Sequence, residues 1–115
     1  MSGKSSRTKG HAFERDMAEQ FRELGFTKCK TSRYESKMLD DMDVDLTHTD
    51  PFNIQCKAVE NLGAAHDTLS KMPKDSNYNV VLHKRNRKGT IACMELEDFN
   101  EIIQMLIINT IIKQP

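Results

Sequence analysis

The sequence lacks a long hydrophobic run and paired cysteines. No stretch approaches the roughly 18 consecutive apolar residues that cross a bilayer. The opening segment, MSGKSSRTKGHAFERD, lacks the apolar core of a secretory signal. The three cysteines, Cys29, Cys56 and Cys93, are an odd number without a CxxC pair, which argues against a disulfide framework or a zinc site. We therefore expect a soluble, cytoplasmic protein with reduced cysteines.

Net charge is also absent, because seventeen Lys and Arg balance seventeen Asp and Glu in 115 residues. The distribution is nevertheless uneven. Residues 1–40 hold nine basic and six acidic side chains, residues 61–90 hold six and two, and residues 41–60 hold one and five. Carboxylates repel a phosphate backbone, so this acidic centre does not suit a protein that only grips nucleic acid. It suits a metal-dependent nuclease, although charge runs are also common on solvated faces.

The length fits a single domain, residues 1–115, with a polar start at residues 1–8 that we expect to be a flexible basic tail. Apolar side chains at helical spacing, from Phe13 to Leu24, predict a helix over residues 10–24 that ends before Gly25. Further along we expect strands at 26–34, 44–48 and 52–59, a helix at 62–72, strands at 78–85 and 90–96, and a helix from residue 97. The expected class is α/β (α+β), with a mixed central sheet flanked by helices.

Five aspartates precede Gln55 in the segment MLDDMDVDLTHTDPFNIQCKAVEN. Alternation along the strand at 52–59 places Gln55 and Lys57 on one face and the apolar side chains on the other. A hairpin turn centred on Asp50 then sets Asp45 opposite Gln55 and Asp43 opposite Lys57. A slip of one residue would turn the aspartates into the core, where unpaired carboxylates are costly.

Hard divalent cations such as Mg²⁺, or Mn²⁺ in its place, take oxygen ligands of the kind that this hairpin offers. Asp45 supplies a carboxylate, and the Gln55 side chain and the Cys56 backbone carbonyl supply neutral oxygens. Glu14, at the edge of the apolar stripe of the first helix, adds a second carboxylate. Lys57 would stabilise charge on the scissile phosphate or orient the attacking water.

These residues resemble the motif of the PD-(D/E)XK nuclease superfamily: Asp45, then Gln55-Cys56-Lys57 ten residues later, after a helix that carries Glu14. The segment RTKGHAFERDMAEQFRELGF is similar to the opening of archaeal and phage-type Holliday junction resolvases, and the resemblance covers about residues 7–85. It implies a restriction-endonuclease-like αβββαβ core with a C-terminal helix added. It also implies a Mg²⁺-dependent homodimer that cuts branched DNA in recombination and repair, with Glu14, Asp45, Gln55 and Lys57 as the metal and catalytic positions. The cell would be bacterial, archaeal or phage-infected.

Gln55 departs from the motif, because it stands where the superfamily usually has a second acid. The lost negative charge weakens metal binding unless Asp43 or Glu14 compensates. Asp43 also shares the parity of Asp45 and is the reserve ligand. Three functions stay open: a junction resolvase, a non-catalytic DNA-binding module on the same fold, and a nuclease of restriction-type or flap-cutting specificity.

Candidate DNA contacts are basic side chains on the two basic flanks, together with residues in the loop before the hairpin. They are Arg7, Lys9, Arg15, Ser32, Arg33, Ser36, Lys84, Arg85, Arg87 and Lys88.

The final helix, FNEIIQMLIINTII, is apolar over more than half its circumference. It either completes a small core or forms a homodimer interface. A two-fold dimer would place two metal sites against the symmetric strands of a junction.

Overall fold

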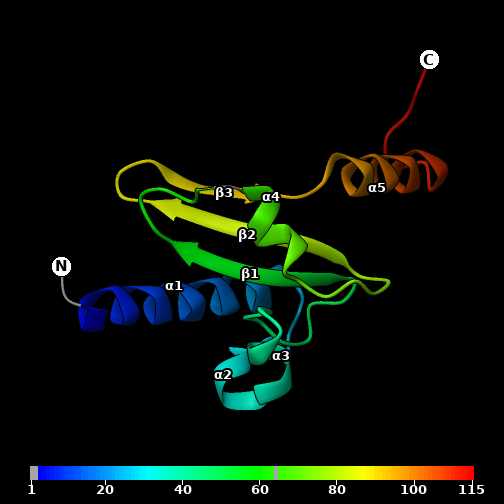
Figure 1. The fold of residues 1–115 in the computed structure, drawn as a ribbon. Helices are drawn as coiled ribbons and strands as arrows, with labels where there is room; N and C mark the ends of the chain where they lie inside the picture. Colours follow the sequence, from blue (N-terminus) through cyan, green and yellow to red (C-terminus); the bar gives the residue numbers. More distant parts are fainter. Residues whose placement is uncertain (1–2, 64) are drawn as a thin grey trace.

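The computed structural model describes residues 3–63 and 65–115 and is an α+β fold (Figure 1). Its elements are α1 Gly3–Leu24, α2 Ser32–Glu35, α3 Lys37–Asp41, β1 Phe52–Ala58, α4 Ala65–Ser70, β2 Tyr78–Arg85, β3 Gly89–Cys93 and α5 Leu96–Ile108. Within these residues no helix is both long enough and apolar enough to span a bilayer. Residues 1 and 2 of the expected tail and residue 64 of the helix expected at 62–72 lie outside the described residues.

The three strands form one mixed sheet in the order β1-β2-β3. β1 and β2 are parallel, with Phe52 beside Tyr78 and Ala58 beside Lys84, and β2 and β3 are antiparallel. A parallel pair needs a crossover connection, and residues 59–77, which include α4, provide it. The prediction of a mixed sheet is confirmed.

Side-chain alternation divides the core between the two faces of this sheet. Phe13 of α1 packs with Ile54 and Leu82 on one face, and Leu69 of α4 packs with Val81 on the other. Helix α1 therefore covers the face that holds the larger cluster (Figure 1).

Helix α1 ends where the sequence predicts, at a glycine that takes a backbone conformation most residues avoid. Gly25 has φ +130° and its N–H bonds to the Arg22 carbonyl at 3.2 Å, while the Phe26 N–H bonds to the Phe21 carbonyl at 3.0 Å. This pair of bonds is a Schellman motif, completed by the stacked rings of Phe21 and Phe26 at 5.7 Å between centroids. The start differs from the prediction, because the helix begins at Gly3 rather than near residue 10, so most of the expected tail is helical.

The predicted strands at 26–34 and 44–48 are wrong. Only one isolated antiparallel bridge, between Thr31 and Leu46, links these segments, and residues 32–41 instead form the short helices α2 and α3. Ser36 explains part of this outcome, because its hydroxyl accepts from the Leu39 N–H at 3.3 Å and caps α3. The expected β-meander is therefore not formed, and no full strand pairs with the outer edge of β1 among the described residues.

Helix α5 follows β3 and projects beyond the sheet, so the molecule extends 54 Å along its longest axis (Figure 1). None of its residues is buried, and a hydrogen bond from the Tyr78 hydroxyl to Glu101, at 3.0 Å, ties it to the sheet. The structure therefore does not show the alternative in which this helix completes the core of its own chain.

Candidate metal centre

Asp45 lies at the outer edge of β1. Its backbone N–H donates to the Ile54 carbonyl at 2.7 Å, and its carboxylate Oδ2 accepts from the Cys56 N–H at 2.7 Å. These two bonds bracket Gln55, so Asp45 sits beside the strand position that the sequence assigns to it, although no continuous hairpin forms.

Burial removes water from the Asp45 carboxylate and raises its pKa to about 6. The hydrogen bond from Cys56 opposes this shift, whereas the carboxylates of Glu14 and Asp40 add to it. Lys57 acts in the other direction and favours the ionised form. Asp45 is therefore a half-desolvated acid surrounded by further negative charge, an arrangement that a bound cation would stabilise.

Glu14 reaches the same region from α1. The Nε of Arg33, in α2, donates to its Oε2 at 2.9 Å, and the two side chains are only 13% and 23% exposed. The guanidinium of Arg33 is thus committed to Glu14 through Nε, while its Nη2 is buried and has no hydrogen-bond partner among the described residues. Arg33 belongs to the candidate site itself rather than to an outer DNA-contacting loop.

The Cys56 thiol lies near the same two carboxylates, Asp45 and Glu14. Burial, and then the neighbouring carboxylates of Asp45 and Glu14, raise the pKa of its thiol, so the thiol stays protonated. The carbonyl of Cys56 is the more useful group. The N–H and C=O of one strand residue point to the same edge, so this carbonyl faces the edge where Asp45 accepts the Cys56 N–H.

Gln55 and Lys57 lie on the opposite face of β1 from Ile54 and Cys56, as the alternation predicts. Gln55 is only 6% exposed, and its Oε1 has no hydrogen-bond partner within the part of the chain that the structure describes. An unpaired buried oxygen costs about 1–3 kcal/mol, so Gln55 Oε1 is an unsatisfied acceptor of this strand.

The residues present fit a hard divalent cation. Within residues 3–63 and 65–115, no group of three or more His, Cys, Asp or Glu side chains is placed to hold a metal ion. A Mg²⁺ site does not require one, because Mg²⁺ uses one or two carboxylates and keeps several waters. Asp45 and Glu14 supply the charge, and the Cys56 carbonyl is a neutral oxygen at the same edge. The unpaired Gln55 Oε1 belongs to the next residue along the strand, whose side chain lies on the other face of β1 from that of Cys56.

Asp43 is not placed as a second ligand opposite Lys57. It has φ 62° in the turn that follows α3, where its N–H bonds to the Asp40 carbonyl at 3.2 Å, so the hairpin strand that would set it opposite Lys57 is not formed. Asp40 is, beside Glu14, the second acid that acts on Asp45, and the sequence did not indicate it. The available signal was its place in the acidic run, one residue before Asp41.

Ser32 and Ser36 have structural roles. Ser32 is fully buried, its hydroxyl donates to the Val44 carbonyl at 2.6 Å, and its N–H donates to the Asp45 carbonyl at 2.8 Å. The prediction that Ser32 contacts DNA is wrong, because a buried hydroxyl cannot reach a surface ligand. Ser32 instead fixes the start of α2 against the Val44–Asp45 backbone, and Ser36 caps α3.

The remaining basic candidates are exposed, and several of them gather at one end of the molecule. Arg7, Lys9 and Arg15 lie along α1, and Lys84, Arg85, Arg87 and Lys88 surround the turn between β2 and β3. Figure 1 shows this turn at the same end as the start of α1. The ammonium of Lys84 lies 5.9 Å from the centre of the Phe13 ring, which connects the two groups, and Arg85 approaches Glu60 at 3.7 Å.

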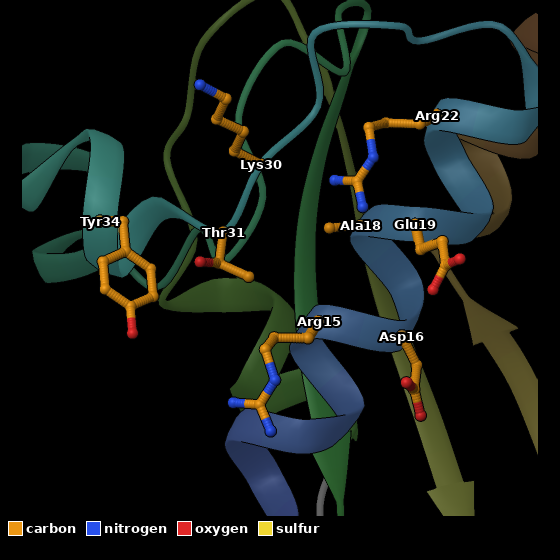
Figure 2. Close-up of a pocket in the computed structure, with 8 residues that line it drawn as sticks. All are labelled: Arg15, Asp16, Ala18, Glu19, Arg22, Lys30, Thr31 and Tyr34. Atoms are coloured by element: carbon orange, nitrogen blue, oxygen red, sulfur yellow. The ribbon is translucent and has the colours of Figure 1, made fainter.

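An open cavity of about 580 Å³ lies between α1 and the segment from Lys30 to Tyr34. Figure 2 shows Arg15 and Tyr34 reaching into this space from α1 and α2, with Lys30 above them. Arg22 also lines it and donates to the Cys29 carbonyl at 2.8 Å, which holds the wall in place. Of these residues the sequence had indicated only Arg15, because nothing local reveals which side chains line a cavity.

Comparisons with protein-family models, with curated proteins and with solved structures found no match to this chain.

Proposed function

We propose that this chain is a Mg²⁺-dependent DNA endonuclease, similar to Holliday junction resolvases, that hydrolyses phosphodiester bonds in branched DNA. The observation that carries the proposal is the edge of β1. There the buried Asp45 carboxylate accepts the Cys56 N–H, with the charges of Glu14, Asp40 and Lys57 within electrostatic reach. Such a set is typical of sites that bind a cation and a phosphate together.

Each residue has a separate role in this proposal. Asp45 and Glu14 hold the metal, with the Cys56 carbonyl and the Gln55 side chain as neutral ligands. The bound metal supplies a Lewis acid for the phosphate and lowers the pKa of a water. Lys57 donates to the phosphate oxygen on which charge develops. The exposed basic side chains of α1 and of the β2–β3 turn hold backbone phosphates away from the scissile bond.

Asp40 can supply the negative charge that is missing because position 55 is a glutamine rather than an acid. The amide of Gln55 carries no charge, but the carboxylate of Asp40 acts on Asp45 from α3. We infer that Asp40 restores the negative potential that a second motif acid would provide. The compensation comes from a different residue than Asp43, which the sequence had put in reserve.

A homodimer through α5 completes the proposal. The helix exposes Leu96, Phe99 and Ile108 by 70%, 49% and 78%. A second copy of the same helix would cover this surface, because an isologous interface matches a patch with itself. The two metal centres would then face the two symmetric strands of a junction.

One observation favours a non-catalytic DNA-binding module as the second candidate. Arg33 neutralises Glu14 with a short, largely buried ion pair. In a site that has lost its metal, such a pair would take the place of the cation. Replacing Arg33 with glutamine separates the two cases. If the arginine competes with a metal for Glu14, the replacement should strengthen Mg²⁺ binding. If the site has lost its metal, the replacement should not produce Mg²⁺ binding.

The deciding experiment incubates the protein with a labelled four-way junction and with a linear duplex of the same length, in Mg²⁺ and in EDTA. We expect Mg²⁺-dependent cutting of the junction that Asp45→Ala and Lys57→Ala both abolish. Binding without cutting by the wild type would favour the non-catalytic module. Equal cutting of junction and linear duplex would favour a nuclease of another specificity.

A further inference from the structure

Tyr34 is the most exposed aromatic side chain of the described residues, with 82% of its surface accessible. The guanidinium carbon of Arg33 lies 5.5 Å from the centre of its ring. The ring therefore rests on a cation that is itself bound to Glu14 at 2.9 Å, and most of its surface remains open to a ligand.

The position of Tyr34 is fixed relative to the candidate metal centre. It belongs to α2, whose first residue, Ser32, makes two short hydrogen bonds to the carbonyls of Val44 and Asp45 at 2.6 and 2.8 Å. The backbone that carries Tyr34 is therefore held, two residues away, against the backbone of the main candidate ligand.

The cavity beside Tyr34 has the charge that a nucleic acid backbone requires. Arg15 and Lys30 are exposed and line the same space as the ring. Asp16 and Glu19 also line it, but Figure 2 shows these two carboxylates leaving α1 on the side away from Tyr34. The side of the cavity nearest the ring is therefore basic.

We propose that this cavity is a subsite for an unpaired nucleotide of the DNA substrate, whose base stacks on Tyr34 while its phosphates contact Arg15 and Lys30. The inference rests on the proposed function for the identity of the ligand as DNA, and it adds a requirement for an unpaired base near the cut. In a duplex each base is already stacked on its neighbours. Only an unpaired base, at a branch point or in a single-stranded arm, offers a free face to the ring.

The test measures binding rather than cutting, so that it does not depend on the metal. Fluorescence anisotropy in EDTA compares a splayed-arm DNA, which has a duplex and a single-stranded arm, with a blunt duplex of equal length. We expect wild type to prefer the splayed arm, and Tyr34→Ala to lose about tenfold in affinity for it, in line with the loss of one base–aromatic stack. Blunt-duplex affinity should stay within about twofold.

Two variants control for other effects. Tyr34→Phe keeps the ring and should retain the preference for the splayed arm. Met38→Ala truncates another exposed side chain, 68% accessible and on the neighbouring α3, and should change neither affinity. Because Tyr34 is so exposed, its replacement should leave the circular dichroism spectrum unchanged.

A tryptophan reporter gives an independent readout. The chain has no tryptophan, so Tyr34→Trp carries a single indole at the proposed stacking position. Its emission should be quenched by the splayed-arm DNA and much less by the blunt duplex.

Equal losses of Tyr34→Ala on both DNAs, an unchanged preference, or no DNA binding by the wild type would each overturn the proposal. Its failure is distinguishable from failure of the nuclease proposal. If the protein cuts DNA but Tyr34→Ala binds the splayed-arm DNA as tightly as wild type does, the subsite alone is refuted. A protein with the Tyr34-dependent preference and no cutting in Mg²⁺ refutes the nuclease alone.

Discussion

The outer edge of β1 and the helix α5 depart from the usual arrangement of a small domain in opposite ways. At the edge, ionisable side chains are largely removed from water: desolvation raises the pKa of Asp45 to about 6, and the Glu14 side chain is 13% exposed. In α5, apolar side chains are exposed, with 78% of Ile108 accessible. Each arrangement raises the free energy of the isolated chain. The comparison teaches where each region would gain most from a partner: a cation at the edge of β1, and an apolar surface on α5.

The largest effect is expected from removing the charge at the edge of β1. Asp45→Asn keeps an oxygen that can accept from the Cys56 N–H but removes the ionised ligand. We expect it to reduce junction cleavage roughly a hundred- to a thousand-fold, the scale seen when one electrostatic group is lost from an active site. Cleavage time courses on gels in Mg²⁺ provide the measurement.

Asp41→Asn is the matched control for this substitution. Asp41 belongs to the same acidic run, but its carboxylate is 62% exposed, and its ion pair within the described part of the chain is with the neighbouring, exposed Lys37. Cleavage by Asp41→Asn should equal that of wild type. Equal losses for both variants would show that general negative charge matters, and not the edge of β1.

The next largest effect is on the free energy of unfolding, when one isoleucine in each region is replaced with alanine. Ile54 of β1 is 2% exposed and Ile108 of α5 is 78% exposed. Ile54→Ala should lower the free energy of unfolding by about 3–4 kcal/mol, through lost burial and a residual cavity. Ile108→Ala should change it by less than about 0.5 kcal/mol when measured on the monomer. Urea unfolding at low protein concentration checks both values, and similar losses would mean that α5 packs on its own chain.

The raised pKa of Asp45 predicts how stability depends on pH in the metal-free protein. The folded state holds this proton up to about pH 6, whereas the unfolded state releases it near 3.8. The unfolded state therefore binds fewer protons between these values, so stability falls as pH rises through that window and stays low above it. The full shift corresponds to up to about 3 kcal/mol.

Asp45→Asn should remove this pH dependence, and in EDTA at neutral pH it should be more stable than wild type. Chemical denaturation in EDTA between about pH 4 and pH 7 tests this, and the window follows from the two pKa values. Addition of Mg²⁺ at neutral pH should stabilise wild type but not the variant. A wild-type protein whose stability rises across the window would contradict the burial of this carboxylate.

Charges placed on α5 are expected to have the smallest effect on the stability of the folded monomer. Their effect on dimer formation is expected to be large. Leu96→Glu with Ile108→Glu should convert a dimer to a monomer in sedimentation velocity experiments, because buried unpaired carboxylates oppose association. Monomer stability should hardly change, since both positions are exposed. If the wild-type protein is already monomeric at high concentration, a homodimer does not explain the exposed apolar surface of α5.

Periodic segments were predictable from the sequence. The apolar stripe of α1, the alternation along β1, the strands β2 and β3 and the helix α5 were all expected from their spacing, and all are present. The wrong strands fall between Phe26 and His48. There Ser36 caps α3 locally, and the hydroxyls of Ser32 and Thr47 bond to the carbonyls of Val44 and Lys30, 12 and 17 residues away. Neither kind of hydrogen bond leaves a periodic signal in the sequence.

By itself the sequence determined which side chains can share a face. It placed Gln55 and Lys57 together on β1 and set Asp45 beside them, because the period of a strand is fixed by backbone geometry. Only the tertiary structure decided which side chains of other elements meet at this edge. Arg33 of α2 pairs with Glu14, and Asp40 of α3 is one of two acids that act on Asp45. The tertiary structure also decided that Tyr34 opens onto a basic cavity. These contacts depend on how α1 and α2 pack against the sheet edge, and no local spacing specifies that packing.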